Sequence, residues 1–398
     1  MATRFLIIDV EGPLDGSAFN PNSRLSLVGL YDGSSFHQFD LEHSGRPYGE
    51  SVRRIQALVD NADVLVAFNS KYDLHWLRRY GIRVHHKKLW CLQYAEFCLS
   101  GQSGWPKIYP DLDTACLRRG LEGKSSYIWD TYWSKGTDTV HIPWQELADY
   151  NKQDLKIEWD LFQAQRKELE EKPDLKRLIW WGSQDLLITE EMEWNGIKFD
   201  TALAVRTGDQ LLEESKAVEG QLASIVGSDR VLWSSPAQVS AVLFGGVVKY
   251  DDREEYLFQY KDGRTAIKSR KVVREIAFPR IVEPYKNSKS KSEERDQWST
   301  DEQTLRKLKA HGKAKDIISL LLKKRELEKR VGTYYHGFVN TMREHCWEGD
   351  LLHTQLSHCR AASGRLASKS PNVQNLEDGM RKCIVTRFPI SSASSSAS

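Results

Sequence analysis

The chain has 398 residues, of which 40% are hydrophobic and 28% charged, and its formal net charge is +2. This length and hydrophobic content allow two or three domains with buried cores. The sequence contains no 18-residue apolar run and no signal-like N-terminal stretch, which excludes a membrane protein and predicts a soluble protein of the cytoplasm. The six cysteines form no C-x-x-C pair, so we expect reduced, mostly packed thiols and no structural zinc.

The charge is distributed unevenly along the chain. Residues 1–260 hold 29 Lys and Arg against 39 Asp and Glu, whereas residues 261–345 hold 22 against 12. The second region is basic enough to bind a polyanion. A solvated helical face explains the same charges, and by charge alone it is the favoured explanation.

The first 170 or so residues alternate strand and helix patterns, which predicts an α/β domain with helices flanking its strands. Strands are expected at residues 3–10, 24–31, 35–41 and 63–68, and helices at residues 50–59 and 72–80. Pro143 opens a long expected helix over residues 144–169.

Beyond Pro173 the pattern becomes mostly helical. Residues 253–294 are polar and irregular, which indicates an insertion or a flexible loop. A basic helix is expected over residues 317–341, and the Ser/Ala tail at 390–398 is expected to be disordered.

Acidic residues fall at positions where chemistry is common in α/β proteins. Asp9 and Glu11 end the first apolar strand, and their spacing of two directs both side chains to one face. The carboxyl ends of such strands are where ligands bind. Asp73 follows a second buried strand, and Tyr150 and Asp154 are four apart on the long helix, hence on one helical face.

Carboxylates that converge without a matching Lys or Arg repel one another, and hard divalent cations relieve that repulsion. We therefore expect two Mg²⁺ or Mn²⁺ ions that clamp the attacking and leaving oxygens of an in-line phosphoryl transfer. Tyr150 is expected to orient or help deprotonate the attacking water. Each motif also has an ordinary explanation, because Asp-x-Glu and Tyr-x-x-x-Asp occur as surface patterns and Asn69 could cap a helix.

In their order and context, these residues resemble the three motifs of DEDD-type exonucleases, namely Asp9 with Glu11, Asn69 to Asp73, and Tyr150 to Asp154. The tyrosine is similar to that of the DEDDy subgroup, whose fold is ribonuclease-H-like. The resemblance implies a 3′→5′ exonuclease in which the two acidic residues of the first motif and the last aspartate hold one metal. The first aspartate also reaches the second metal, which the middle aspartate helps to hold. Gly12 departs from the pattern, since the family usually has a Thr or Ser there that assists substrate positioning.

The rest of the chain resembles family A DNA polymerases. Residues 190–200, EEMEWNGIKFD, are similar to the family's "EMExxGixxD" segment, and WSSP at 233–236 followed by LFGG at 243–246 is similar to "SPxQ…LFGG". WST at 298–300 precedes a stretch similar to the family's thumb helix. Residues 363–375, SGRLASKSPNVQN, are close to "TGRLSSxxPNLQN".

The resemblance implies a proofreading exonuclease that is the N-terminal part of a family A polymerase. The fold class is then an α/β ribonuclease-H-like exonuclease domain, a mainly α-helical thumb region and an incomplete palm. The expected boundaries are residues 1–172 for the exonuclease domain, 173–345 for the thumb and connecting region, 346–388 for the partial palm, and 389–398 for the tail.

The resemblance also implies contacts with DNA, both single-stranded 3′ ends and primer–template duplex. Arg325 and Lys329 would touch the duplex backbone, and Arg365 would reach the minor groove near the primer terminus. Further contacts are implied for Asn69, Asn372, Gln374 and Asn375. A solvated helical face is the alternative for the first two residues, and a structural loop arginine is the alternative for Arg365.

The polymerase motifs that bind catalytic metal and incoming nucleotide do not follow residue 388, so no polymerase activity is expected from this chain alone. A second polypeptide could carry the palm and fingers, as in some bacteriophages (the host cytoplasm would then be its location), or the gene could be interrupted. Two other functions stay open: a non-catalytic DNA-binding subunit of a split polymerase, and a stand-alone RNA-trimming DEDDy nuclease.

Overall fold

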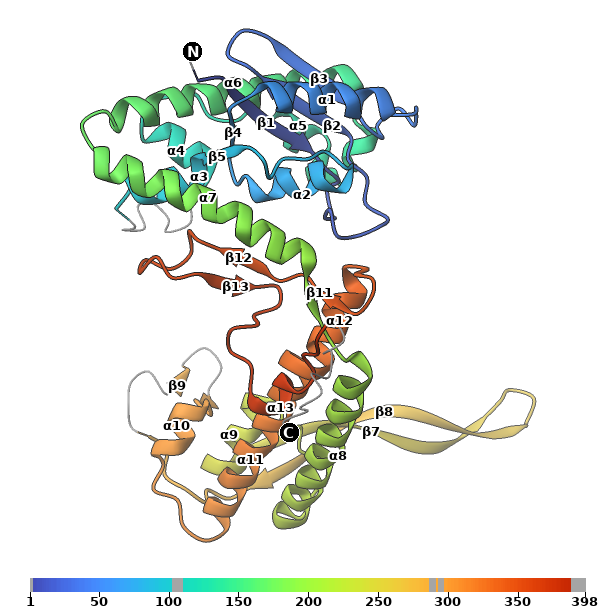
Figure 1. The fold of residues 1–398 in the computed structure, drawn as a ribbon. Coiled ribbons are helices and arrows are strands. Elements are labelled where there is room, and N and C mark those ends of the chain that lie inside the picture. The colour runs from blue at the N-terminus through green and yellow to red at the C-terminus, as the bar shows by residue number, and fades with distance from the viewer. Residues whose placement is uncertain (1–2, 102–109, 286–290, 293–296, 388–398) are drawn as a thin grey trace, which may run out of the picture. The chain divides into compact units, whose positions relative to one another are not determined.

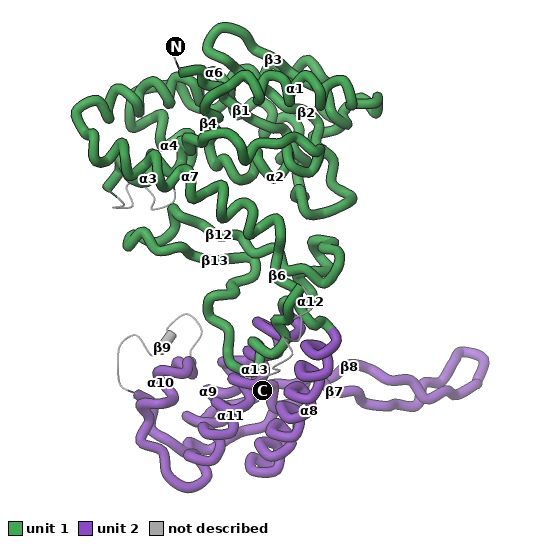
Figure 2. The backbone as a smooth tube through the Cα atoms, viewed as in Figure 1, with its two compact units in different colours: residues 1–201, 338–398 green, residues 202–337 purple. Residues whose placement is uncertain are grey.

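The structure is a computed structural model that describes residues 3–101, 110–285, 291–292 and 297–387. The chain forms two compact units (Figure 2): unit 1 comprises residues 1–201 and 338–398, and unit 2 comprises residues 202–337. Among the described residues, no helix is both long and apolar enough to cross a membrane. The tail at 390–398 lies outside the described residues.

A five-stranded mixed sheet lies at the centre of unit 1, with strand order β3-β2-β1-β4-β5. β1 pairs antiparallel with β2 on one side and parallel with β4 on the other. The strands are β1 Phe5–Glu11, β2 Leu27–Tyr31, β3 Phe36–Asp40, β4 Val64–Ala67 and β5 Lys88–Cys91. The first four match the expected strands, and the short β5 was not predicted.

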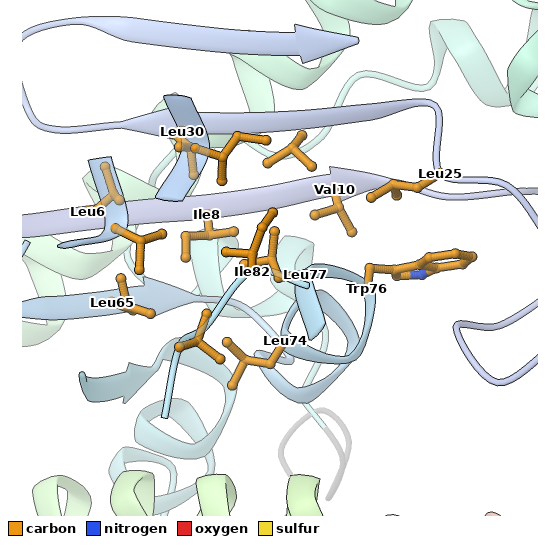
Figure 3. Close-up of a cluster of buried hydrophobic side chains, with 14 of the residues drawn as sticks. Leu6, Ile8, Val10, Leu25, Leu30, Leu65, Leu74, Trp76, Leu77 and Ile82 are labelled. Carbon is orange, nitrogen blue, oxygen red and sulfur yellow. The ribbon is translucent and has the colours of Figure 1, made fainter. Parts of the chain in front are cut away.

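Side chains alternate along β1, so they pack into two separate hydrophobic cores. Leu6, Ile8 and Val10 point into one core, shown in Figure 3, whereas Ile7 belongs to the other. Continuing the same alternation places the odd-numbered Asp9 and Glu11 on the face of Ile7. The side chains of Asp9 and Glu11 therefore project from the face of the sheet that α6 covers.

Helices pack on both faces of this sheet (Figure 1). Those of the N-terminal region are α1 Gly49–Asn61, α2 Lys71–Arg79, α3 Leu92–Leu99, α4 Leu112–Leu117, α5 Tyr127–Thr131, α6 Trp144–Glu168 and α7 Pro173–Asn195. Side chains of α1 and α2 enter the first core, and side chains of α3, α4 and α6 enter the second. The long helix expected after Pro143 is confirmed, with Pro143 itself at the N-cap.

Unit 1 also contains short elements, all but the first of them from the C-terminal part of the chain. They are β6 Ile197–Lys198, α12 His336–Glu344 (in this unit from Phe338 on), β11 Leu351–Leu352, β12 Gln355–Ser357, β13 Ala367–Lys369 and α13 Asp378–Arg381. β6 pairs with β11, and β12 pairs with β13. All six cysteines are free and five of them are buried, as the sequence predicts.

Unit 2 is mainly helical and has its own core. Its elements are α8 Thr201–Val226 (in this unit from Ala202 on), α9 Pro236–Phe244, β7 Gly246–Gln259, β8 Thr265–Phe278, β9 Lys291–Ser292, β10 Gln297–Trp298, α10 Glu302–Lys307, α11 Lys313–Arg330 and a π-helical turn Val331–Tyr335. The core gathers apolar side chains from α8, α9 and α11. The basic helix expected over 317–341 is thus α11 and its continuation.

The expectation that residues 253–294 are irregular is wrong for residues 253–259 and 265–278. β7 and β8, 14 residues each, pair in register as one long antiparallel hairpin (Figure 1). Both faces are rich in charged residues, so the alternating apolar pattern of a half-buried strand is missing. Cross-strand ion pairs such as Lys271 with Asp251 and Arg270 with Glu254 accompany the pairing. Residues 286–290 and 293–294 of that segment lie outside the described residues.

Candidate metal centre

Three carboxylates converge where β1 meets α6. Asp9, Glu11 and Asp154 each offer an oxygen, and these oxygens lie within 4.8 Å of one another. Asp9 and Glu11 come from the C-terminal end of β1, and Asp154 comes from the middle of α6. Glu11 and Asp154 are buried, and Asp9 is partly exposed.

Asn151 holds the acidic pair of β1 in place. Its Nδ2 lies 2.8 Å from Oδ2 of Asp9 and 3.3 Å from Oε1 of Glu11, donating to both. Gly29, which pairs with Asp9 across β1 and β2, makes room for this amide, because a Cβ at position 29 would overlap Oδ1 of Asn151. Sequence reasoning missed both residues, which carry no signal apart from Asn151 adjoining Tyr150.

Asp73 lies in the first turn of α2, is buried, and is close enough to Asp9 to feel its charge. Burial and then the charge of Asp9 raise the pKa of Asp73 well above its usual value, although backbone hydrogen bonds, one of them from Val10, lower it. Asp73 therefore lies near the three carboxylates, but it is not one of the residues whose oxygens lie within 4.8 Å of one another.

Glu158 is a fifth carboxylate near the site, is buried, and was missed by sequence reasoning. It follows Asp154 by one helical turn on α6, and its Oε1 accepts a hydrogen bond of 3.4 Å from the N–H of Phe68. Burial, followed by the charges of Asp9 and Asp73, raises its pKa well above the usual value. The spacing 150, 154, 158 on one helix was a signal that could have identified it.

Burial is the largest cause of raised carboxyl pKa values throughout the cluster. The pKa of Asp9 is raised to about 7, and those of Glu11 and Asp154 are raised as well. The charges of neighbouring carboxylates act in the same direction as burial, whereas the charge of Lys124 lowers the pKa of all three groups. A nearby cation would stabilise the ionised form of carboxyl groups whose pKa is raised in this way.

One such cation belongs to the protein. Nζ of Lys124 lies 2.6 Å from Oδ2 of Asp154. Burial lowers the pKa of Lys124, but the charges of Asp9 and Asp154 outweigh burial and hold it above its usual value. The carboxylates therefore do not converge without a matching cation, which was the condition of the charge argument made from the sequence. Lys124 is 30 residues from Asp154 in a segment without periodicity, so only the tertiary fold reveals the pair.

Tyr150 lies beside this ion pair. Nζ of Lys124 is 5.7 Å from the centre of the Tyr150 ring, and the Trp133 ring packs edge-on at 5.6 Å. Burial raises the pKa of the Tyr150 phenol, with Asp154 and Glu11 adding to the rise and Lys124 opposing it. The phenol therefore keeps its proton, and it is suited to donate a hydrogen bond more than to act as a base.

The donor set fits a divalent cation. Oδ1 of Asp154 and Oε2 of Glu158 are buried and have no hydrogen-bond partner among the described residues. Unpaired buried carboxylate oxygens are costly, and coordination of a hard cation removes that cost. A ligand group that consists of carboxylates and includes no thiol suits Mg²⁺ or Mn²⁺.

The residue that departs from the motif, Gly12, has its side-chain space filled by neighbours. A Cβ there would lie 2.5 Å from the hydroxyl of Tyr72 and 3.2 Å from Nε1 of Trp76. Asn69, which precedes α2 with a φ of 54°, lines a cavity of about 390 Å³ together with Tyr72. The cavity therefore adjoins the start of the helix that carries Asp73.

The other residues expected to bind DNA lie on α11 and on either side of β13. In unit 2, Lys329 is exposed on α11, whereas Arg325 is half-buried and its Nη1 donates to the carbonyl of Thr300. Burial lowers the pKa of Arg325. A fully solvated face therefore does not describe Arg325.

In unit 1, Arg365, Asn372, Gln374 and Asn375 are exposed around β13. Oε1 of Gln374 accepts from the N–H of Ser368 at 3.0 Å, and its Nε2 donates to the carbonyl of Leu366 at 3.0 Å. Oδ1 of Asn372 accepts from Oγ of Ser368 at 3.0 Å. The side chains of Gln374 and Asn372 thus shape this loop.

The fold and the site define an α/β protein with a buried carboxylate cluster, suited to a divalent cation, at the end of its central strand. The family model of DNA polymerase family A matches residues 247–391. The likeness to family A DNA polymerases expected from the sequence is therefore confirmed, and it includes part of both units.

Relatives and solved structures agree with this likeness. DNA polymerase I of Synechocystis sp. is 25% identical over 309 residues, which is 77% of this chain and 26% of that protein. DNA polymerase I of Geobacillus stearothermophilus is 26% identical over 212 residues, 50% of this chain and 19% of that protein. This chain thus spans about a quarter or less of the length of these two relatives.

A solved structure with a similar fold is the POL domain of Pol1 from M. smegmatis, in complex with DNA primer-template and dNTP. It matches with a TM-score of 0.62 at 15% sequence identity, covering 96% of this chain and 54% of that one. At this identity the likeness shows the fold alone.

Proposed function

We propose that this chain is a divalent-metal-dependent 3′→5′ exonuclease that removes nucleotides from DNA 3′ ends, within a family A polymerase-like protein. The observation that carries the proposal is the meeting of Asp9, Glu11 and Asp154 within 4.8 Å, from the end of β1 and the middle of α6. In this proposal residues 1–172 form a ribonuclease-H-like exonuclease domain, residues 173–345 the thumb and connecting region, and residues 346–388 part of a palm.

The carboxylates would hold the metal in the roles that the motifs imply. Asp9, Glu11 and Asp154 would bind one ion, and Asp73 would help Asp9 to hold a second. Two divalent ions at this place would stabilise the attacking and leaving oxygens of an in-line phosphoryl transfer. Asn151 keeps the Asp9 and Glu11 side chains oriented through its two hydrogen bonds.

Tyr150 would act on the attacking water, and Lys124 would act on the approach of the phosphodiester. The raised pKa of the Tyr150 phenol supports orientation of the attacking water by a hydrogen bond, in preference to deprotonation of that water. Lys124 neutralises part of the carboxylate charge, which would let the phosphodiester anion approach.

The polymerase-like residues would position DNA. Lys329 is exposed and would contact a duplex phosphate, and Arg365 is exposed and would reach a minor groove. Asn69 and Asn375 would contact the strand directly. The internal hydrogen bonds of Arg325, Asn372 and Gln374 support a role in shaping the surfaces beside these contacts.

A labelled-end assay tests the proposal. The full chain is incubated with 5′-labelled single-stranded DNA or RNA, in Mg²⁺ or in EDTA, beside Asp9→Ala and Asp154→Asn. We expect Mg²⁺-dependent shortening from the 3′ end of DNA, lost by several orders of magnitude in both variants. Asp160→Asn is the matched control, since it removes an exposed α6 carboxylate that pairs with Lys156, and it should retain the activity.

Each other outcome selects a different function. DNA binding without shortening would support a non-catalytic DNA-binding subunit and overturn the nuclease proposal. Faster shortening of RNA than of DNA would support an RNA-trimming nuclease.

A further inference from the structure

The hairpin of β7 and β8 has two chemically different faces. The register pairs Tyr256 with Lys268, Glu254 with Arg270 and Phe258 with Ala266. Because side chains alternate along each strand, the even-numbered residues of both strands share one face of the hairpin. Figure 1 shows the hairpin extending away from the helices of unit 2, and both faces of its distal part carry exposed side chains, such as Tyr256 on one face and Leu257 on the other.

One face carries a row of aromatic rings beside a row of cations, and we name it the aromatic face. Its members on the distal half are Tyr256, Phe258, Tyr260, Arg264, Lys268 and Arg270. Nζ of Lys268 lies 3.5 Å from the Phe258 ring centre and 4.8 Å from that of Tyr260. The guanidinium carbons of Arg270 and Arg264 lie 5.6 and 5.7 Å from the rings of Tyr256 and Tyr260. The cations are thus aligned along the rings before any ligand is present.

Charge is also segregated along the hairpin. Residues 253–271, the distal half as the register pairs it, contain six Lys or Arg and three Asp or Glu, whereas the proximal residues 246–252 and 272–278 contain two Lys or Arg and three Asp or Glu. Some distal cations are partly neutralised, since Arg270 pairs with Glu254 at 2.7 Å and Arg264 with Asp262 at 2.6 Å. The distal half nevertheless keeps a net positive charge, which complements a polyanion.

We propose that the aromatic face binds a single strand of nucleic acid. Bases would stack on Tyr256, Phe258 and Tyr260, which lie at every second position of one strand. The phosphates between them would meet Arg264, Lys268 and Arg270 on the neighbouring strand. Rings interleaved with cations are the combination that recognises single strands without sequence preference, whereas a duplex hides the faces of its bases.

The opposite face offers a built-in comparison. It carries the exposed apolar side chains Leu257, Ile267 and Val273, at 70%, 71% and 63% exposure. It also carries Lys249, Arg253 and Lys271, which match the three cations of the aromatic face in number. A protein partner would bind the apolar residues of this face, whereas a nucleic acid would bind the aromatic face. Substitutions on each face therefore distinguish the two classes of ligand.

The test measures binding of a 5′-fluorescent oligothymidylate to the full chain in EDTA, by anisotropy between 50 and 200 mM salt. The triple variant Arg264→Gln, Lys268→Gln, Arg270→Gln should weaken binding at least tenfold and flatten the salt dependence by about two units. The charge-matched control Lys249→Gln, Arg253→Gln, Lys271→Gln should weaken binding less than threefold. Circular dichroism and thermal unfolding check that both variants keep the fold.

A second triple variant tests the rings. Tyr256→Ser, Phe258→Ser, Tyr260→Ser should weaken single-strand binding about tenfold or more while leaving the salt dependence nearly unchanged. A blunt duplex of the same length should lose less affinity with this variant than the single strand does.

Three results would overturn the proposal: equal losses in the two charge variants, unchanged affinity in the ring variant, or loss of binding only with Leu257→Ser and Ile267→Ser. The last result would indicate a protein-binding hairpin. Binding in EDTA needs no cleavage, so failure of the nuclease assignment leaves this test intact.

Discussion

At the scale of single residues, we expect Lys124 to compete with a bound metal for the carboxylates of the cluster. It makes a 2.6 Å ion pair with Asp154, one of the three residues whose oxygens converge. An ammonium group and a divalent cation both relieve the same repulsion, so the protein holds a partial substitute for the ion. Removal of the lysine should therefore have opposite effects on stability and on metal affinity.

We expect Lys124→Gln to lower the free energy of unfolding in EDTA by about 1–3 kcal/mol, because it leaves the buried Asp154 carboxylate without its partner. The same variant should bind Mn²⁺ more tightly, by roughly tenfold, because a positive charge has left the site. Urea unfolding and calorimetric titration measure the two quantities.

Lys156→Gln is the control for this substitution, since Lys156 lies on α6 and pairs with the exposed Asp160. It should change neither quantity by more than about 0.5 kcal/mol. Metal affinity that is unchanged or weaker in Lys124→Gln would contradict a competition between the lysine and the ion.

The raised pKa of Asp9 predicts an unusual pH dependence. Burial is the main reason that the pKa of Asp9 is about 7 in the folded chain, compared with 3.8 for a carboxyl group that is not buried. Between those pH values the folded chain keeps a proton that the unfolded chain has lost, so the free energy of unfolding falls as pH rises from about 4 to 7. The fall should be a few kcal/mol at most in EDTA, and Mg²⁺ should reduce it by replacing the proton.

Urea unfolding from pH 4 to 8 checks this expectation, with Asp9→Asn as the comparison because asparagine cannot ionise. Subtracting the two curves gives the contribution of Asp9 together with the pKa changes that its charge causes in Asp73 and Glu158. A difference that is flat over this range, or that rises with pH, would show that the folded chain does not hold the proton.

At the scale of elements, the sequence predicts much of the site because the relevant signals are local. A spacing of two along a strand places Asp9 and Glu11 on one face, and a spacing of four along a helix does the same for Tyr150 and Asp154. The structure then brings Asp9, Glu11 and Asp154 together.

The missed features depend on contacts between distant parts of the chain. Lys124 meets Asp154 across 30 residues, and β5 has too few residues for a clear pattern. The hairpin of β7 and β8 was missed for another reason: solvent reaches both of its faces, so no apolar alternation was needed. Its Asp262-Gly263 turn, with φ of 83° at Gly263, was the overlooked signal.

The packing of α6 on β2 depends on a missing side chain. A Cβ at Gly29 would overlap the Asn151 amide that orients Asp9 and Glu11. We expect Gly29→Ala to cost about 1–3 kcal/mol of unfolding free energy through overpacking, and to reduce Mg²⁺-dependent cleavage by at least tenfold. Urea unfolding and the labelled-end assay measure the two effects.

Gly49→Ala serves as the control, because nothing lies within 4 Å of a Cβ there and the residue begins α1. It should keep full activity and gain up to about 1 kcal/mol. Full activity in Gly29→Ala would show that Asn151 is not needed to orient the carboxylates.

At the scale of the whole molecule, unit 1 is built from two distant stretches of sequence, residues 1–201 and 338–398. Glu193 of α7 ties them together: the N–H of Leu356 donates to its carboxylate, and its carbonyl lies 2.8 Å from Nδ1 of His353. The carboxylate also pairs with Lys71 at 2.5 Å. The pairing of β6 with β11 adds a second link between the stretches.

This organisation predicts that the chain cannot be cut equally well everywhere. A fragment of residues 202–337 contains the whole of unit 2 with its own core, so it should unfold cooperatively in urea. A fragment of residues 1–201 lacks the second stretch, which exposes Glu193 and the β6 edge. It should unfold at lower urea than unit 1 does in the full chain, by about 2 kcal/mol or more.

A peptide of residues 338–387 added to the 1–201 fragment distinguishes this cause from general damage. Binding of the peptide should raise the unfolding midpoint in proportion to its concentration, because it stabilises only the folded fragment. A peptide with Leu356→Pro should not do so, since it lacks the N–H that donates to Glu193. If the fragment alone matched the stability of unit 1 in the full chain, the second stretch would be an accessory to a fold already complete within residues 1–201.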